Sequence, residues 1–238
     1  MRRGEGGSTG KAPEQAKMGA VMKTTDNWHA LPKGFEGDFD AVLNGGGPFT
    51  GACYIFKGDS YVKYDWNTDQ AVAGYPKKIA GNWPGLPSLF FSDIDAAING
   101  EGAFAGNCYF FKGDSYVKFD WVKDHAVYDA PKKIAGNWPG LPAGFEGDFD
   151  AAGNGRGQFA GKAYFFKGDS YVRFDWKNDH ADAGYPKKIA DGWNMLPSGF
   201  QKDRCATLEG FGAFVSKAYL FKGNDYLRYD WALDRADG

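Results

Sequence analysis

The sequence repeats itself every 55 residues, and this period limits the fold more than any other feature. A Phe-Lys-Gly tripeptide and an Asp-Trp pair each occur four times at this interval, without insertion or deletion. A chain with a long fixed period folds as a solenoid, a propeller or a similar array. The tripeptides begin at Phe56, Phe111, Phe166 and Phe221, and the pairs end at Trp66, Trp121, Trp176 and Trp231.

Each repeat carries signals for short strands. In the third repeat, residues 148–152 precede an Asn-Gly turn dipeptide, and residues 163–167 are apolar and aromatic, as in a buried strand. Residues 171–176 alternate between apolar and charged side chains, which predicts a strand with two different faces. Residues 185–189 contain a proline, which suits an outer edge strand because it lacks a ladder donor. One repeat therefore predicts one four-stranded sheet, the blade of a β-propeller.

The two ends of the chain complement each other. The fourth repeat stops before any Pro-Lys-Lys-Ile segment, whereas residues 26–32 match residues 81–87 one period later. Aromatic residues make up 17% of the chain, and 35 glycines fit aromatic strands joined by tight turns. We expect an all-β, four-bladed β-propeller whose ring is closed by the N-terminal segment. The expected parts are a disordered tail or expression leader at 1–20 and one domain at 21–238, with repeats at about 31–85, 86–140, 141–195 and 196–238, the last completed by 21–30.

Composition argues against several classes of protein. The 28 basic and 30 acidic residues give a net charge of −2, without the basic excess typical of a nucleic-acid binder. No stretch is long and apolar enough to cross a membrane, and the polar N-terminus lacks the apolar core of a signal peptide. We expect a cytoplasmic protein without nucleic-acid or membrane partners, with non-classical secretion as the alternative.

The order of the motifs resembles the hemopexin repeat. Phe-Asp-Ala-Ala is followed by Tyr-Phe-Phe-Lys-Gly-Asp-x-Tyr and then by Pro-Lys-x-Ile, and the resemblance covers four units from about residue 21 to residue 238. Hemopexin-like domains are four-bladed propellers of haem carriers, matrix metalloproteinases, vitronectin, seed albumins and microbial relatives. Secreted members usually join blades one and four by a disulfide, which is not evident here. Cys53 and Cys108 occupy equivalent places on adjacent blades, too far apart to pair, and are expected to be buried thiols.

The resemblance implies a cation on the axis of the ring. In similar proteins, backbone carbonyls of an inner-strand position converge on calcium, and those two residues later hold a second ion such as sodium, often with chloride nearby. Carbonyl oxygens suit such hard cations. The first ring here is Asp40, Asp95, Asp150 and Cys205, and the second is Val42, Ala97, Ala152 and Thr207.

A further row of aspartates precedes the first ring by two residues in every repeat. Period-two geometry places both rows on one strand face, which predicts an acidic channel mouth that attracts cations. The alternative is that these aspartates cap turns. The row is Asp38, Asp93, Asp148 and Asp203.

Haem or a similar small molecule is the leading interpretation for a further ligand, and His29, His125 and His180 are its candidates. His125 and His180 are equivalent loop positions about a quarter turn apart, so they do not readily share one iron within a chain. An axial ligand could still come from one histidine, from Tyr or Cys, or across a dimer. Solvated loop residues are the alternative.

Three other kinds of ligand stay open. Repeated aromatic and polar groups on equivalent blades favour a lectin, because aromatic rings stack on sugars and repetition gives multivalency. An acidic channel suits a polyamine, as in the similar seed albumins, and a protein-interaction role is known for the metalloproteinase domains. We expect a monomer or a homodimer.

Catalytic signatures are missing from the sequence. It contains no His-Glu-x-x-His zinc motif, Gly-x-Ser-x-Gly elbow or P-loop. We therefore expect a non-enzymatic ligand-binding protein without catalytic residues.

Overall fold

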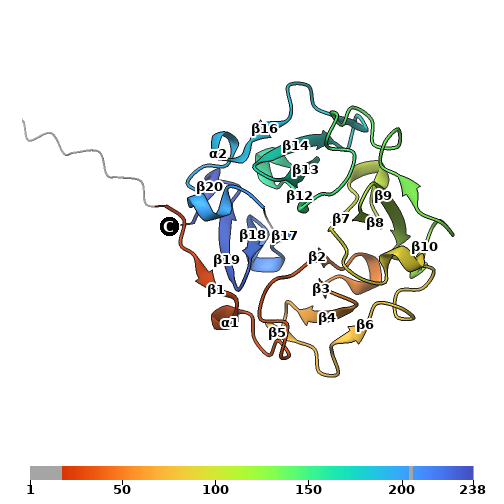
Figure 1. Cartoon of the computed structure of the whole chain (residues 1–238). Coiled ribbons are helices and arrows are strands. Elements are labelled where there is room, and N and C mark those ends of the chain that lie inside the picture. Colours follow the sequence, from red (N-terminus) through yellow and green to blue (C-terminus); the bar gives the residue numbers. More distant parts are fainter. Residues whose placement is uncertain (1–17, 204–205, 238) are drawn as a thin grey trace, which may run out of the picture.

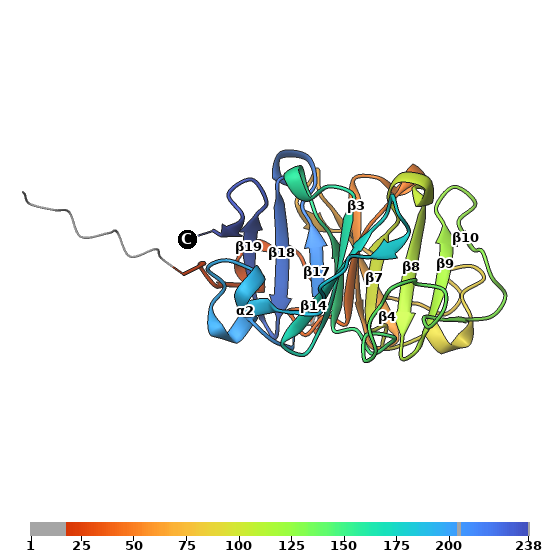
Figure 2. The same ribbon diagram turned by 90° about the horizontal axis from the view of Figure 1, so that it is seen from above.

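Four antiparallel sheets stand around one axis as the blades of a propeller (Figure 1). This computed structural model describes residues 18–203 and 206–237. Figure 2 shows the ring edge-on, with the innermost strands running along its axis. The predicted all-β, four-bladed architecture is confirmed.

Each blade is built outwards from the axis by three strands that are consecutive in the chain. The innermost strand has four residues and the next two have six each. The innermost strands are β2 (Ala41–Asn44), β7 (Ala96–Asn99), β12 (Ala151–Asn154) and β17 (Ala206–Glu209). The next two are β3 (Ala52–Lys57) and β4 (Ser60–Asp65), β8 (Asn107–Lys112) and β9 (Ser115–Asp120), β13 (Lys162–Lys167) and β14 (Ser170–Asp175), and β18 (Lys217–Lys222) and β19 (Asp225–Asp230).

Two short strands share the outer edge of each blade, where the sequence predicted a single fourth strand. In blade three, one outer strand pairs with the end of β14 and the other with its start. Between them Gly184 has a φ of 82° and Pro186 has no N–H, so the ladder is interrupted. The outer strands are β5 (Gln70–Ala71), β6 (Lys77–Lys78), β10 (His125–Ala126), β11 (Lys132–Lys133), β15 (His180–Ala181) and β16 (Lys187–Lys188), with β20 (Arg235–Ala236) and β1 (Met22–Lys23) in blade four.

Helical segments are short and lie in the connections. No helix of the described residues is long and apolar enough to cross a membrane. The segments are α1 (Thr24–Asn27), α2 (Ile189–Gly192), η1 (Gly47–Phe49), η2 (Ser88–Phe90), η3 (Gly102–Phe104), η4 (Gly157–Phe159), η5 (Ser198–Phe200) and η6 (Gly212–Phe214).

The N-terminal segment completes blade four, as predicted. Strand β1 pairs antiparallel with β19, and the two lie side by side in Figure 1. The N–H groups of Gly19 and Ala20 donate to the carbonyls of Met195 and Asp237 at 2.9 and 2.7 Å. Contact with blade four thus begins two residues before the expected start of the domain at residue 21. The rest of the expected tail, 1–17, lies outside the described residues.

Aromatic side chains between adjacent blades form the core. One tryptophan lies in each of the four interfaces, only 3–5% exposed. Cys53 and Cys108 are buried free thiols, as predicted, and burial raises the pKa of both. The interface tryptophans are Trp28, Trp83, Trp138 and Trp193.

Ring closure depends on Trp28, which the N-terminal segment inserts between blades four and one. It contacts aromatic rings of both blades, among them Tyr64 and Phe221. Truncating such a buried side chain typically costs about 3–5 kcal/mol. We predict that Trp28→Ala lowers the free energy of unfolding by this amount, as does the equivalent Trp83→Ala, measured by urea denaturation. A loss below about 1 kcal/mol for Trp28→Ala alone would contradict ring closure by this segment.

Candidate functional site

Acidic side chains gather at the end of the axis where the innermost strands begin. In blade two, the Asp95 carboxylate accepts a 2.6 Å hydrogen bond from the Gly113 N–H. Burial raises the pKa of Asp95 above its ordinary value, the hydrogen bond opposes this, and the charge of Asp148 on the next blade raises it further. Asp40 and Asp150 have the same bonds and shifts in their own blades. Carboxylates of neighbouring blades therefore meet at this end of the axis, each beside a lysine of its own blade, Lys57, Lys112 or Lys167.

The outer acidic row belongs to turns. Asp93 has a φ of 47°, and its N–H donates to the Gly58 carbonyl of the preceding blade at 2.9 Å. Its three equivalents, Asp38, Asp148 and Asp203, do the same. The prediction that both rows share one strand face is wrong, because the strands begin after both rows and a left-handed residue breaks the alternation. The backbone of these aspartates forms the turns. The side-chain charges of Asp93, Asp148 and Asp203 also raise the pKa values of Asp40, Asp95 and Asp150.

Backbone groups of the innermost strands have no strand partner on the side of the axis. Alternate residues of an antiparallel strand bond toward the partner strand. The Gly45 N–H donates to the Ala52 carbonyl, so the backbone groups of Gly45, Leu43 and Ala41 point toward β3. The N–H and carbonyl groups of Val42 and Asn44 therefore point away from β3, toward the axis. The same register holds in the other blades for the second predicted carbonyl ring, Val42, Ala97, Ala152 and Thr207.

The channel offers a cation backbone oxygens rather than a side-chain cluster. Among the described residues, no group of three or more His, Cys, Asp or Glu could hold a metal ion. The first predicted ring contains Cys205, which lies outside the described residues. Carbonyls beside an acidic mouth fit a hard cation, and the ion itself stays a prediction.

A ring of asparagine amides, predicted only as turn residues, joins the blades around the other end of the axis. The Asn99 amide donates to the Asn44 carbonyl of the preceding blade at 2.8 Å, and Asn154 donates to Asn99 at 2.8 Å. Asn44 donates to the carbonyl of Glu209, which holds the fourth position. Each asparagine also accepts a hydrogen bond from the Asp-Trp tryptophan of its own blade, namely Trp66, Trp121 or Trp176.

Glu209 departs from this pattern. It is 5% exposed, and its carboxylate accepts a hydrogen bond from the Asn154 N–H. The Trp231 indole N–H, whose equivalents bond to asparagine, is buried without an acceptor. Burial raises the pKa of Glu209, while the charge of Arg156 opposes the shift. Arg156 itself forms an ion pair with Glu101 of the preceding blade.

The three histidines lie apart from one another. His125 and His180 each place Nδ1 within 2.8 Å of the next residue's carbonyl. Their rings lie against Gly85 and Gly140 of the preceding blade, where an added Cβ would collide with them. His29 is 3.7 Å from Asp69. These contacts dock one blade's turn onto its neighbour, and they do not bring two histidines to one iron. Haem binding stays a prediction that no contact here supports.

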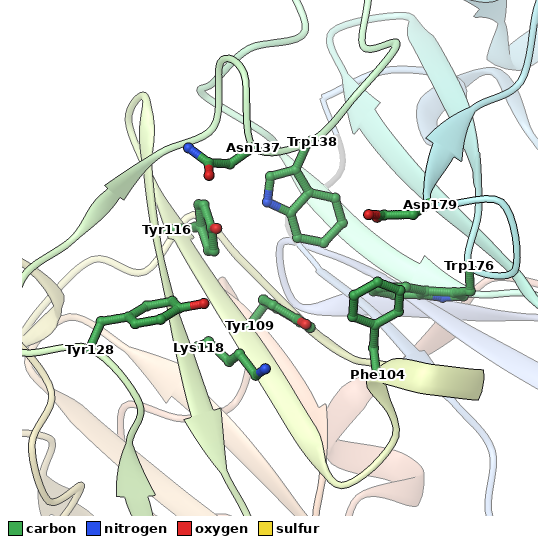
Figure 3. A pocket seen from close by; sticks show the side chains of 9 residues that line it. All are labelled: Phe104, Tyr109, Tyr116, Lys118, Tyr128, Asn137, Trp138, Trp176 and Asp179. Carbon is green, nitrogen blue, oxygen red and sulfur yellow. The ribbon is translucent and has the colours of Figure 1, made fainter.

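Aromatic pockets open between adjacent blades at all four interfaces, and Figure 3 shows one of them. We name them by the blades that they join. The empty space of each pocket, including its opening to solvent, is about 440 Å³ for the 1/2 pocket, 420 Å³ for 2/3, 330 Å³ for 3/4 and 510 Å³ for 4/1.

One pattern of residues lines all four pockets. In the 2/3 pocket, blade two supplies Phe104, Tyr109 and Lys118, and blade three supplies Trp176 and Asp179. Tyr109 and Trp176 stack across the interface with ring centroids 6.0 Å apart. Figure 3 shows the Lys118 side chain beside the Tyr109 ring and the carboxylate of Asp179 pointing toward Trp138. An aromatic floor with a cation and a carboxylate at its rim is thus repeated around the ring.

The fold and the repeats agree with a known family. The Hemopexin family model matches residues 39–88, 94–143 and 149–198. The chain belongs to the hemopexin family. Human matrix metalloproteinase-21 is 27% identical over 179 residues, which are 73% of this chain and 30% of that protein. The chain therefore spans less than a third of the length of this relative. Hemopexin domains are non-catalytic parts of such proteinases.

Solved structures of seed proteins share the hemopexin fold. A plant lectin with two metal binding sites from Cicer arietinum is 24% identical, with a TM-score of 0.68 over 81% of this chain and 86% of that one. A plant albumin from Cicer arietinum showing hemagglutination is 23% identical, with the same TM-score and coverage. At this identity the likeness establishes the fold.

Glu209 gives this site a pH dependence. The pKa of Glu209 in the folded protein is raised, so folding favours the protonated carboxyl group and the ionised carboxylate opposes folding. The stabilisation that the protonated form provides is present below about pH 4.3, the ordinary glutamate pKa, and is lost as the pH rises above this value. We predict that Glu209→Gln is more stable than the parent protein at pH 8 and that the difference disappears near pH 4, measured by urea denaturation at both pH values. A destabilised Glu209→Gln at pH 8 would show that the carboxylate supports the fold through Arg156.

Proposed function

We propose that this hemopexin domain is a non-catalytic, multivalent saccharide-binding module whose binding sites are pockets between blades. The observation that carries the proposal is the repeated combination of a stacked aromatic floor with a cation and a carboxylate at its rim. Aromatic faces pack on the C–H faces of sugars, while charged groups hydrogen bond to hydroxyls.

The relatives support a binding role of this kind. Two seed proteins of the same fold are a lectin and a hemagglutinating albumin. The metalloproteinase relatives support the protein-interaction alternative, since hemopexin domains bind other molecules. The pockets favour a saccharide over a protein partner because each is a small aromatic recess between two blades.

A glycan array tests the saccharide proposal directly. We predict saturable binding to a restricted group of glycans, competed by the free methyl glycoside of the best-bound terminal sugar. Because the pocket floors are tryptophans, the same sugar should change the intrinsic tryptophan fluorescence of the protein. A uniformly blank array, from protein that circular dichroism shows to be folded, would contradict the proposal.

An axial cation is a second candidate ligand, favoured by the carboxylates of Asp40, Asp95 and Asp150 that meet at one end of the axis. The carbonyl rings would hold calcium or sodium there, and the aspartates would attract the ion without ligating it through their side chains. One of the seed lectins has two metal binding sites. A polyamine would compete for the same charge.

Thermal unfolding tests the cation. Calcium at 100 times its dissociation constant should stabilise the protein by about 2.7 kcal/mol over the same protein in EDTA. Asp95→Asn keeps an acceptor for the Gly113 N–H but removes a charge, so it should gain less from calcium and be no less stable in EDTA. Stabilisation by spermine with none by calcium or sodium would overturn the ion and favour the polyamine.

A further inference from the structure

The four pockets differ in whether their charged groups already have partners. The cation is lysine in two pockets and arginine in the other two. Arg173 of the 3/4 pocket bonds to Asp182 at 2.5 Å, and Arg228 of the 4/1 pocket lies 3.3 Å from Asp237. In the other two repeats, valines replace these aspartates. The ammonium groups of Lys63 and Lys118, which line the 1/2 and 2/3 pockets, have no hydrogen bond or ion pair among the described residues.

The rim carboxylates show the same division. Asp234 of the 3/4 pocket accepts a 2.6 Å hydrogen bond from the Tyr229 hydroxyl, and Asp69 of the 4/1 pocket accepts one from Tyr64 at 2.7 Å. Phenylalanines, Phe119 and Phe174, replace these tyrosines in blades two and three. Asp124 of the 1/2 pocket and Asp179 of the 2/3 pocket therefore lack this donor, and no described residue takes its place.

Each of the two pockets also contains a buried indole N–H without an acceptor, that of Trp83 or Trp138, both only 5% exposed. The 3/4 pocket contains such a donor too, in Trp231, so this feature does not divide the pockets. Figure 3 shows the Trp138 nitrogen on the edge of the ring that faces Tyr116 and Tyr128 inside the pocket. A buried donor without an acceptor is costly, and a ligand oxygen is one way to satisfy it.

The aromatic floors of the two pockets are fixed by the axial ring. Trp121 and Trp176 are held by Asn99 and Asn154, as Trp66 of the 4/1 pocket is held by Asn44, whereas Trp231 of the 3/4 pocket has lost this anchor because Glu209 replaces the asparagine. A rigid floor with unpaired rim charges is prepared for a ligand, because binding requires neither the rupture of an ion pair nor the ordering of the floor.

We propose that saccharide binding is confined to the 1/2 and 2/3 pockets, because the rim charges of the 3/4 and 4/1 pockets are already engaged in hydrogen bonds and ion pairs within the protein. This inference rests on the proposed function and reduces the valency of each chain from four to two. The ligand class is a neutral pyranose with adjacent hydroxyls, which Asp124 or Asp179 accepts from and Lys63 or Lys118 donates to. The two sites lie on neighbouring interfaces, on one side of the ring.

The indole N–H signals of the eight tryptophans report on each pocket separately in a ¹⁵N–¹H NMR spectrum. The probe is the methyl glycoside of the terminal sugar best bound on the glycan array, and signals are assigned by Trp→Phe variants. We expect the signals of Trp83 and Trp138 to shift in a saturable manner. The signals of Trp28 and Trp193 in the other two pockets should stay in place.

Matched variants at one repeat position provide the control. Asp69, Asp124, Asp179 and Asp234 are equivalent, and all adopt a left-handed backbone that asparagine tolerates. Asp124→Asn should weaken binding at the 1/2 pocket at least about tenfold and leave the Trp138 shift intact, and Asp179→Asn should do the reverse. Asp69→Asn and Asp234→Asn still accept from their tyrosines and should change neither signal.

The outcomes separate the two proposals. Shifts of the Trp28 or Trp193 signals, or lost binding in Asp69→Asn or Asp234→Asn, would overturn the division of the pockets while saccharide binding itself stands. If no tryptophan signal shifts with any sugar, saccharide binding in these pockets is wrong, and the division of the pockets has no function to explain.

Discussion

The packing of each blade's apolar face onto the next blade is the constraint on which the rest of the structure depends. A single small sheet cannot bury its own faces, and a row of four would leave two faces bare. Closing the row into a ring buries them all, and Trp28 fills the last interface from the N-terminal segment. Sheets that fan out from one axis diverge toward the rim, so the largest side chains fill the widening gap. The aromatic pockets are a consequence of this geometry.

The axis and the pockets are connected through the asparagine ring. Each asparagine holds the neighbouring blade through its amide and a pocket tryptophan through its side-chain oxygen, as in Asn99 with Trp121. One side chain thus fixes both the spacing of the blades and the floor of a pocket. Glu209 breaks the pattern in blade four, and ion pairs engage the arginines of both pockets that include this blade.

The sequence predicted the parts of the structure that a single repeat encodes. The period gave the number of blades, the missing end of the fourth repeat gave the ring closure, and the spacing of Cys53 and Cys108 gave two buried, unpaired thiols. The divided outer edge was not predicted, because the short strands on either side of Gly184 and Pro186 have no apolar pattern of their own. The turn role of Asp93 was weighed as an alternative, but its left-handed φ is not written in the alternation of residues.

The pockets escaped prediction because each is assembled from two repeats. Tyr109 and Trp176 belong to different blades, and nothing in their spacing indicates that they stack. The division into pockets with unpaired and with paired rim charges did leave a signal in the aligned repeats. Blades three and four have Arg with Asp where blades one and two have Lys with Val, and this joint change can be read directly from the amino-acid sequence.

A crystal structure of the protein soaked with the best-bound methyl glycoside is the most direct measurement of the central claim. The account predicts sugar density on the aromatic floors of the pockets beside Trp83 and Trp138, with oxygens at Asp124 and Asp179, and none in the two pockets that include blade four. Density in all four pockets, or sugar bound only on the outer edges of the blades or in the axial channel, would contradict it.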